Sequence, residues 1–194
     1  MERIYFDHIY KISLLNEKGF VEDSADSGLA TLDGVSLRFL KMNGIDINSD
    51  GKVNREDIFA LDDKEIKKLY YKYFWKRGKL PQICKATSGS DLIIPKQFFD
   101  IILNMGIKGG SKLLQKAISI EMKKLGFPEL IIDGVIGTKT LMALRKVPNL
   151  KILNDTLVSE RVLRYAEIVR IAPVKAKFLV GWIVRSFKYR IGVI

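Results

Sequence analysis

The 194-residue sequence is poor in cysteine and contains no long apolar run. Its single cysteine, Cys84, excludes an intramolecular disulfide and a metal site built from several cysteines, and we expect it to be a small buried side chain. The longest apolar run late in the chain, residues 178–184, is far shorter than the roughly 20 residues that span a bilayer. The first residues also lack the basic start and apolar stretch of a secretory signal. We therefore expect cytoplasmic synthesis and no stable membrane insertion.

The sequence also lacks sustained alternation of apolar and polar residues and any internal repeat, which argues against a β-sheet fold and a solenoid. Apolar residues recur instead at helical spacing. This spacing predicts helices from the start to about residue 16 and over 35–42, 62–75, 95–105, 111–125, 138–145, 159–171 and 175–189. Residues 17–34 have no helical period and contain three glycines, which predicts an extended loop or a short hairpin. We expect an all-α fold with at most a short hairpin near residues 20–35.

Positive charge is concentrated in one half of the chain. Residues 1–104 contain 16 basic and 16 acidic side chains, whereas residues 105–194 contain 17 basic and 6 acidic ones. The second half therefore carries the whole net charge of +11. This asymmetry favours a polyanionic partner for the second half, which leaves nucleic acid, an acidic membrane surface and a cell-wall polymer open.

Residues 46–57, with the sequence DINSDGKVNRED, have the spacing of a calcium-binding loop. The ligand positions one, three, five, seven and twelve are occupied by Asp46, Asn48, Asp50, Lys52 and Asp57. Position seven uses a backbone carbonyl, and the glycine at position six allows the tight turn. An Asp at position twelve resembles dockerin calcium loops and should bind more weakly than the usual Glu. The sequence leaves two alternatives open: a structural calcium, or a metal-free loop of Asx turns that caps the next helix.

Three polar residues of the irregular segment suggest acid–base chemistry. Glu17 follows the first predicted helix, Asp26 comes nine residues later, and Thr31 follows. A carboxylic acid at the edge of an apolar cleft has a raised pKa, which suits a general acid near neutral pH. A second carboxylate could hold a water or stabilise an oxocarbenium-like centre in glycoside hydrolysis. Spacing alone does not single out these residues, because residues 1–104 contain 16 acidic side chains.

Residues 17–36, EKGFVEDSADSGLATLDGVS, resemble a signature of the N-acetylmuramidases of glycoside hydrolase family 108, which include phage endolysins. That signature is E-G-G-Y/F-x-x-x-x-x-D-x-G-G-x-T-x-x-G-I-T/S. Three further motifs follow in the family's order. Residues 70–75 resemble Y-x-x-x-Y-W, and residues 99–106 resemble F-D-x-x-V-N-x-G. Residues 114–117 resemble L-Q-x-A. Two more, residues 133–140 and 178–185, are similar to D-G-x-x-G-x-x-T and F-x-x-G-W-x-x-R of the family's predicted peptidoglycan-binding region. The resemblance covers nearly the whole chain.

The resemblance implies a lysozyme-like helical fold with two regions. Residues 1–104 would form the muramidase-like catalytic region, and residues 105–194 the basic peptidoglycan-binding region. The implied partner is bacterial peptidoglycan, bound by a monomer, with no role for nucleic acid. A wall hydrolase without a secretory signal would be released by a phage or carried on a virion.

The resemblance also assigns roles to individual residues. Glu17 matches the general acid that protonates the glycosidic oxygen, and Asp26 and Thr31 match residues that position the attacking water. Asn104 would be a substrate-positioning amide, and Gly28 would contact the substrate. Catalysis would require no cofactor.

Two departures from the signature matter. Lys18 and Leu29 replace family glycines, which permit positive φ or close approach of the substrate to the backbone. The larger side chains leave open an altered glycan preference or a chain that binds and cleaves poorly. Retention and inversion also stay open, because a carboxyl separation of about 5–5.5 Å favours the first and about 6.5–9.5 Å the second.

Other conspicuous side chains have structural interpretations. The aromatic cluster at residues 70–75 and Trp182 are expected to be core residues, and His8 a surface residue of the first helix. The basic residues of the last segment are expected to form a solvated face; they are Arg161, Arg164, Arg170, Lys175, Lys177, Arg185, Lys188 and Arg190.

Three functions from different classes compete. The first is a muramidase with Glu17 as its acid. The second is a non-catalytic wall-binding or phage structural protein on the same scaffold. The third, a basic nucleic-acid binder, rests on charge alone, since no nucleic-acid-binding motif is present. The sequence favours the first.

Overall fold

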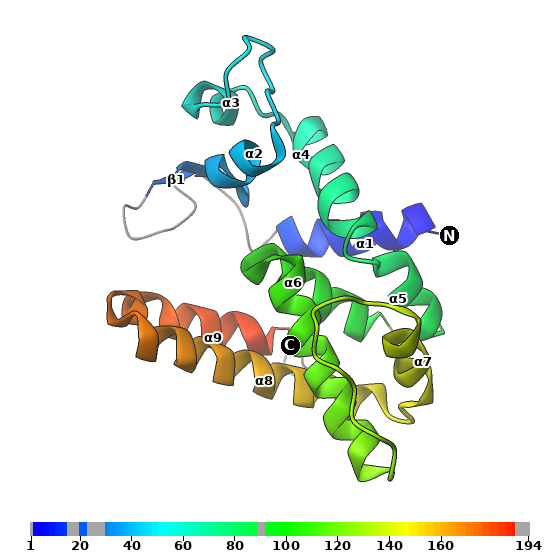
Figure 1. Ribbon diagram of the computed structural model, residues 1–194. Coiled ribbons are helices and arrows are strands. Elements are labelled where there is room, and N and C mark those ends of the chain that lie inside the picture. Colours follow the sequence, from blue (N-terminus) through cyan, green and yellow to red (C-terminus); the bar gives the residue numbers. More distant parts are fainter. Residues whose placement is uncertain (1, 15–19, 23–29, 89–91, 189–194) are drawn as a thin grey trace.

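The computed structural model describes residues 2–14, 20–22, 30–88 and 92–188. In these ranges the chain is mainly helical, and one small sheet lies beside α2 at an edge of the molecule (Figure 1). The elements are α1 (Glu2–Leu14), β1 (Phe20–Glu22), β2 (Ala30–Leu32), β3 (Val35–Ser36), α2 (Leu37–Asn43), α3 (Arg55–Phe59), α4 (Asp63–Leu69), the π-helix η1 (Tyr70–Lys76), α5 (Leu80–Ala86), α6 (Ile93–Lys124), α7 (Thr138–Lys146), α8 (Leu150–Ile171), the 3-10 helix η2 (Pro173–Phe178) and α9 (Leu179–Phe187). The expected all-α, lysozyme-like fold with a short hairpin is confirmed. None of the described helices is long and apolar enough to cross a bilayer.

The three strands form an antiparallel sheet in sequence order. Asp33 and Gly34, with φ of 44° and 81°, make the two-residue turn between β2 and β3. Such a turn matches the right-handed twist of the strands that it joins. β3 leads directly into α2, where Phe39 N donates to Ser36 Oγ at 3.2 Å. Ser36 is therefore the helix cap, and it ties the position of α2 to the sheet.

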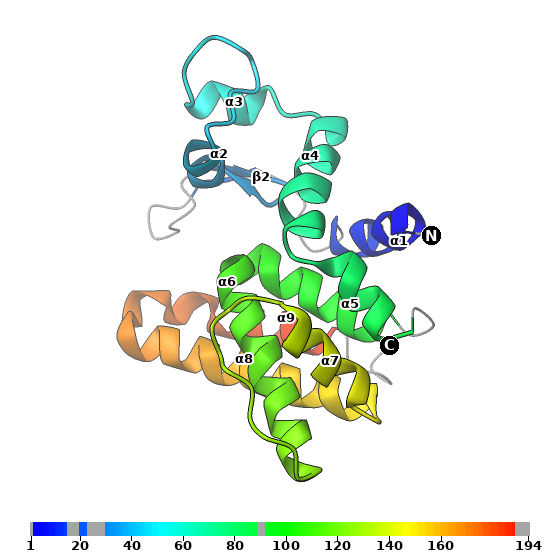
Figure 2. The same cartoon turned by 45° about the vertical axis from the view of Figure 1, so that its right-hand side comes forward.

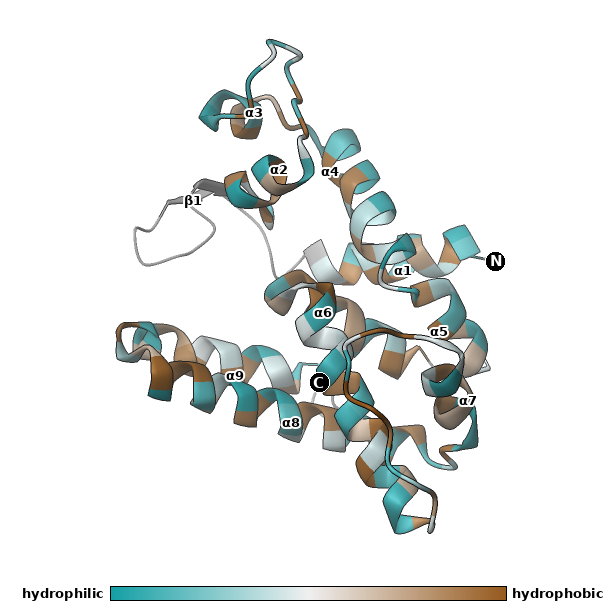
Figure 3. Cartoon of the chain, viewed as in Figure 1, coloured by the Kyte–Doolittle hydropathy of each residue, from teal (hydrophilic) through white to brown (hydrophobic). Residues whose placement is uncertain are grey.

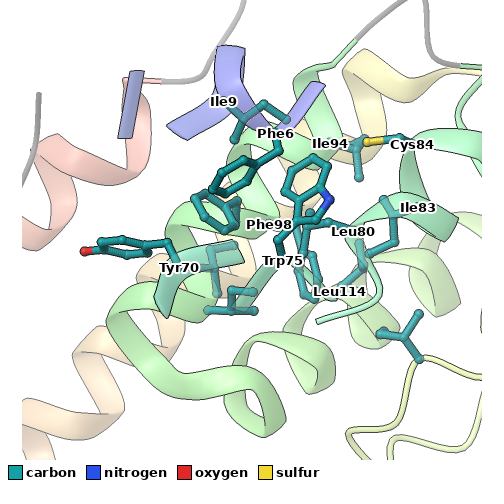
Figure 4. Packing of buried hydrophobic residues seen from close by; sticks show 14 of the residues in the cluster. Phe6, Ile9, Tyr70, Trp75, Leu80, Ile83, Cys84, Ile94, Phe98 and Leu114 are labelled. Carbon is teal, nitrogen blue, oxygen red and sulfur yellow. The ribbon is translucent and has the colours of Figure 1, made fainter. Parts of the chain in front are cut away.

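The main core lies where α1, η1, α5 and α6 meet. Phe6 of α1 is fully buried, and its ring packs edge-on against Trp75 and Phe99 with centroids 5.4 and 6.4 Å away. Figure 4 shows these elements converging, with Cys84 of α5 at the margin of the cluster. Burial raises the pKa of the Cys84 thiol to about 12, so Cys84 is the small core side chain that we expected.

α6 consists of two helical segments that meet at Gly106. This residue has φ of 74° and ψ of 161°, a conformation that glycine adopts without strain. The two predicted helices at 95–105 and 111–125 are thus one kinked element, which occupies the centre of the molecule in Figures 1 and 2. The predicted boundary between residues 104 and 105 falls inside it.

Both halves of the chain contribute to one hydrophobic cluster. It includes Phe98 from the first half of α6, Leu114 from its second half and Leu153 from α8, all fully buried. α8 and α9 lie side by side against α6 in Figures 1 and 2. Figure 3 shows hydrophobic and hydrophilic residues interspersed along α8, and its buried apolar residues include Leu153, Leu157 and Val158.

The sequence-based prediction missed two helices, α3 and α5, and placed the start of α8 too late. α3 and α5 are only 5 and 7 residues long, too short to show a helical period. α8 begins at Leu150 rather than 159, because Asn149 Oδ1 accepts hydrogen bonds from the N–H groups of Lys151 and Ile152. The cap extends the helix by more than two turns.

Candidate active site

Most of the site residues predicted near the hairpin lie outside the described residues. This is the case for Glu17, Asp26 and Gly28. Thr31 lies in β2, where its backbone pairs with Ser36 of β3. Ser36 in turn lines a large cleft, so the strand that carries Thr31 is one strand away from it. The roles of these four residues stay predictions.

The cleft has a volume of about 1100 Å³. One wall comes from β3, α2 and η1, and includes Phe39 and Phe74. The opposite wall comes from α6, α8, η2 and α9, and includes Tyr165 and Trp182. Small-molecule sites have volumes of about 300–1,000 Å³. A cleft of this size suits a segment of a polymer.

Asn104 lines this cleft beside the kink of α6. Tyr165 Oη on α8 donates a hydrogen bond to Asn104 Oδ1 at 2.8 Å, which fixes the orientation of the amide. Among the described residues, none accepts a hydrogen bond from Asn104 Nδ2. Because Asn104 is exposed at the cleft, this N–H₂ group is free to donate to a bound ligand. The geometry suits the predicted substrate-positioning amide, whose role stays a prediction.

A buried carboxylate one turn earlier on α6 joins three helices. Asp100 is fully buried, with Arg161 Nη2 of α8 at 2.6 Å and Arg185 Nη2 of α9 at 2.8 Å. Arg161 Nε also donates to Tyr165 Oη at 3.0 Å, so the network extends to Asn104. Burial alone would raise the pKa of Asp100, but the two guanidinium charges outweigh it and hold this pKa below its usual range.

The prediction that the late basic residues form a solvated face is wrong for two of them. Arg161 is completely buried and Arg185 is largely buried, because both pair with Asp100. Of the other basic residues, Arg164 and Lys175 line the cleft. The remaining described ones are exposed as expected; they are Arg170, Lys177 and Lys188. Arg190 lies outside the described residues. Helical spacing around Arg161 gives no indication of a compensating acid 61 residues earlier.

The aromatic cluster of η1 is divided between core and cleft. Tyr70 and Trp75 are buried as expected. Tyr73 and Phe74 line the cleft instead, where Phe74 stacks on Phe39 of α2 with centroids 5.2 Å apart. The π-helical geometry sets their directions, and the sequence does not predict it.

Trp182 is not a core residue, contrary to our expectation. It is half-buried and lines the cleft, with its ring stacked between Tyr165 and Phe178 at centroid distances of 4.9 and 5.7 Å. Of the described residues of α9, only Ser186 is buried, so an apolar residue of this helix can border the cleft. His8, by contrast, is exposed on α1 as expected.

The 114–117 and 133–140 motifs form one structural clip. Gln115 Nε2 of α6 donates to Asp133 Oδ1 at 2.8 Å and to the Val135 carbonyl at 3.0 Å. Its Oε1 accepts from Gly134 N at 2.8 Å. Since Gln115 is almost fully buried, these groups hold the loop before α7 against α6. Gln115 and the loop at residues 133–135 therefore have a structural role. The sequence does not predict this contact, because the two motifs are separated along the chain.

The predicted calcium loop is closed by its own backbone. Asp46 accepts from the N–H groups of Ser49 and Gly51, both at 2.7 Å. The Asn48 side chain accepts a hydrogen bond from Asp50 N, and the Asp50 side chain accepts one from Lys52 N. No group of three Asp, Glu, His or Cys residues in the described ranges is placed to hold a metal ion. Calcium would require these side chains to turn toward a shared centre.

Asp57 closes the same loop from its far end. Its Oδ1 accepts from Ile47 N at 2.6 Å, and its Oδ2 from Asn54 N at 2.8 Å. Burial would raise the pKa of Asp57, but the backbone donors outweigh it and lower this pKa. Lys52 at position seven is exposed. The Asx-turn alternative thus accounts for these backbone hydrogen bonds, and calcium binding stays a prediction.

If the loop binds calcium, adding the ion will raise the melting temperature of the chelator-treated protein, since a ligand that binds only the folded state stabilises it. Differential scanning fluorimetry with and without millimolar calcium would measure this. The matched variant is Asp50→Asn, which should abolish the shift. An unchanged melting temperature in wild type would show that the loop is a hydrogen-bonded turn without a metal.

The cleft is strongly cationic. Its basic side chains are Arg38, Arg77, Lys112, Lys116, Arg164 and Lys175, whereas its one described acid is Glu167. Arg38 and Arg77 belong to the half whose net charge is zero. Sequence reasoning missed them because a charge summed over a hundred residues conceals a local concentration. No motif separates these two from the other basic residues of that half.

Comparison with known proteins agrees with this architecture. A family profile described as Glycosyl hydrolase 108 matches residues 10–106, and one described as Predicted Peptidoglycan domain matches residues 109–187. The solved structure of Brucella abortus SagA is similar in fold, with a TM-score of 0.72 and 22% sequence identity over 95% of this chain and 91% of that chain. A search of curated protein sequences gives no significant match.

The two profiles together cover both walls of the cleft. The first spans half of the chain and includes the hairpin, α2 and η1, and the second includes α8 and α9. The chain therefore belongs to the glycosyl hydrolase 108 family and is a peptidoglycan hydrolase that acts on the bacterial cell wall.

Proposed function

We propose that the chain is an N-acetylmuramidase that hydrolyses the β-1,4 bond between N-acetylmuramic acid and N-acetylglucosamine. One observation carries this proposal: the glycosyl hydrolase match at residues 10–106 contains the Glu17 signature and one whole wall of the cleft. A polymer-sized cleft next to the hairpin suits a glycan chain that extends on both sides of the cleaved bond.

In this proposal Glu17 is the general acid that protonates the leaving glycosidic oxygen. Asp26 and Thr31 hold the water that attacks the anomeric carbon. Asn104 Nδ2 donates to the substrate, and its orientation is supported by the hydrogen bond from Tyr165. Such donors act by holding the reacting groups in place, which supplies part of the rate enhancement. Gly28 provides close approach of the sugar to the backbone, and no cofactor takes part.

The proposed setting is the wall of a bacterium attacked by a phage. A monomer made in the cytoplasm would reach the wall after release by the phage or as part of a virion, and would be bacteriolytic. The competing function is a non-catalytic wall-binding or phage structural protein, because Lys18 and Leu29 occupy glycine positions of the signature.

The test is digestion of purified peptidoglycan by the wild-type chain. We expect the suspension to clear and new reducing ends to appear, all on N-acetylmuramic acid after borohydride reduction and mass spectrometry. Reducing ends on N-acetylglucosamine, or anhydro-muramic products, would contradict the bond assignment. Tight sedimentation with the wall and no new ends would establish the non-catalytic alternative.

A further inference from the structure

The two regions matched by the family profiles face each other across the same cleft. Arg38 and Arg77 come from the glycosyl hydrolase match, whereas Lys112, Arg164 and Lys175 come from the peptidoglycan match. In Figure 2, α2 and η1 lie above α6 and α8. A separate wall anchor would be expected to present its ligand-binding surface away from the catalytic region. Lys112, Arg164 and Lys175 instead line the cleft that the catalytic region shares.

The cations of the cleft are largely without protein counter-charges. Within the described residues, no ion pair joins Arg38, Lys112 or Lys175 to a carboxylate. Lys112 interacts with Asp133 only through a weaker, longer-range attraction that helps to lower the pKa of Asp133. Arg164 pairs with Glu167, and Lys116 lies 3.8 Å from Glu160. Uncompensated charge of one sign in a concave site concentrates the electric field and attracts ligands of the opposite sign. The cleft therefore suits an anionic ligand.

The cationic wall is held rigidly against the rest of the cleft. Arg164 precedes Tyr165, whose hydroxyl group contacts both Asn104 and the buried Arg161. Arg161 in turn pairs with Asp100 of α6 at 2.6 Å. This network fixes the turn of α8 that carries Arg164 relative to the amide that is proposed to position the sugar. Such preorganisation is what a binding site for a charged group requires.

The chemistry of peptidoglycan identifies which groups these cations would bind. The glycan backbone of an intact strand is neutral, because the lactyl carboxyl of muramic acid is joined to the stem peptide by an amide bond. The carboxylates of the strand are those of the stem peptides, on their acidic side chains and free C-termini. Stem peptides project from alternate sugars, so a strand lying in the cleft would present its carboxylates to the walls.

We propose that the C-terminal region forms one wall of the substrate cleft, where Lys112, Arg164 and Lys175 bind stem-peptide carboxylates of the strand that is being cleaved. This proposal rests on the proposed muramidase function for the identity of the strand. It assigns these three cations of the second half to substrate binding within the cleft rather than to a remote wall anchor.

The test compares wild type with Lys112→Ala/Lys175→Ala on two substrates. One is native peptidoglycan, and the other is the same material with its carboxylates amidated by carbodiimide and ammonia. We expect the double variant to raise KM on native wall about two- to tenfold with kcat little changed, since it removes two partly exposed charge pairs that each contribute modestly to binding. Amidation should raise the wild-type KM similarly and affect the double variant little.

The matched control is Lys139→Ala/Lys151→Ala, which removes two exposed lysines outside the cleft. It should behave as wild type on both substrates. An unchanged KM for the cleft variant, or an equal loss on native and amidated wall, would overturn the proposal. Loss of binding after hydrogen fluoride removes wall phosphate, with stem carboxylates intact, would also overturn it by identifying a phosphate polymer as the ligand.

A binding measurement separates this proposal from the muramidase proposal. Cosedimentation of full-length Glu17→Gln protein with native or amidated wall needs no turnover. If wild type cleaves nothing but binding still depends on carboxylates and on Lys112 and Lys175, the muramidase proposal fails and the charged wall stands. If wild type cleaves the wall but binding depends neither on the carboxylates nor on Lys112 and Lys175, the muramidase proposal stands and the proposed role of the charged wall fails.

Discussion

Replacing Glu17 with Gln is expected to lower the rate of peptidoglycan cleavage by at least about 100-fold. Gln has nearly the shape of Glu but carries no acidic proton, and positioned general acids contribute about 10²–10⁴-fold to reaction rates. The leaving sugar oxygen would then depart without a proton. Reducing-end release from native wall measures the rate, and KM should change little because the side-chain volume is conserved.

The matched control is Glu56→Gln, an exposed side chain at the start of α3 that does not line the cleft. It should retain wild-type activity. Asp26→Asn provides the second arm, with a smaller expected loss if Asp26 orients the water rather than donating a proton. Full activity of Glu17→Gln would show that another residue is the acid, and the search would turn to the remaining carboxylates near the hairpin.

The sequence predicted those elements that depend on neighbouring residues. The helix predicted over residues 35–42 corresponds to α2, whose cap Ser36 accepts a hydrogen bond from Phe39 N only three residues later. The irregular segment before it lacked a helical period, and the described strands form the expected hairpin. The kink at Gly106 was not predicted, because an interruption of apolar periodicity indicates a boundary between two helices as readily as a kink within one.

Contacts between distant segments could not be predicted in this way. The motifs at residues 99–106 and 178–185 were both recognised, but their contact joins Asp100 to Arg185 across 85 residues. Whether an arginine is solvated or buried depends on which acid the fold brings to it. The same reason explains Trp182, whose helical spacing with Phe178 is compatible with either a core or a cleft wall.

Replacing Asp100 with Ala is expected to cost about 3–5 kcal/mol in the free energy of unfolding, the largest loss that we expect from any single substitution in this network. Removing one partner of a buried ion pair leaves an uncompensated charge, and here two guanidinium groups would lose the same carboxylate. Urea denaturation followed by circular dichroism would measure the loss. The exposed Asp63→Ala on α4 is the matched control, with an expected change within about 0.5 kcal/mol.

The same carboxylate should make wild-type stability dependent on pH in the acid range. The folded-state pKa of Asp100 lies below its unfolded value, so its contribution is present above the unfolded pKa of about 4 and is lost as pH falls through the folded pKa. Asp100→Asn keeps the side-chain volume but removes the charge, and its stability should fall less steeply below pH of about 4. A parallel pH profile in both proteins would contradict the assignment.

Replacing all three charged groups together distinguishes electrostatics from packing. In Asp100→Leu/Arg161→Met/Arg185→Met no buried charge is left unpaired, and apolar replacement of buried ion networks is often neutral or stabilising. We expect this triple variant to recover most of the stability that Asp100→Ala loses. Its wall-clearing activity should recover less, because Arg161 no longer donates to Tyr165, which orients Asn104 in the cleft. Equal recovery of stability and activity would show that the network only holds the three helices together and has no part in orienting the amide.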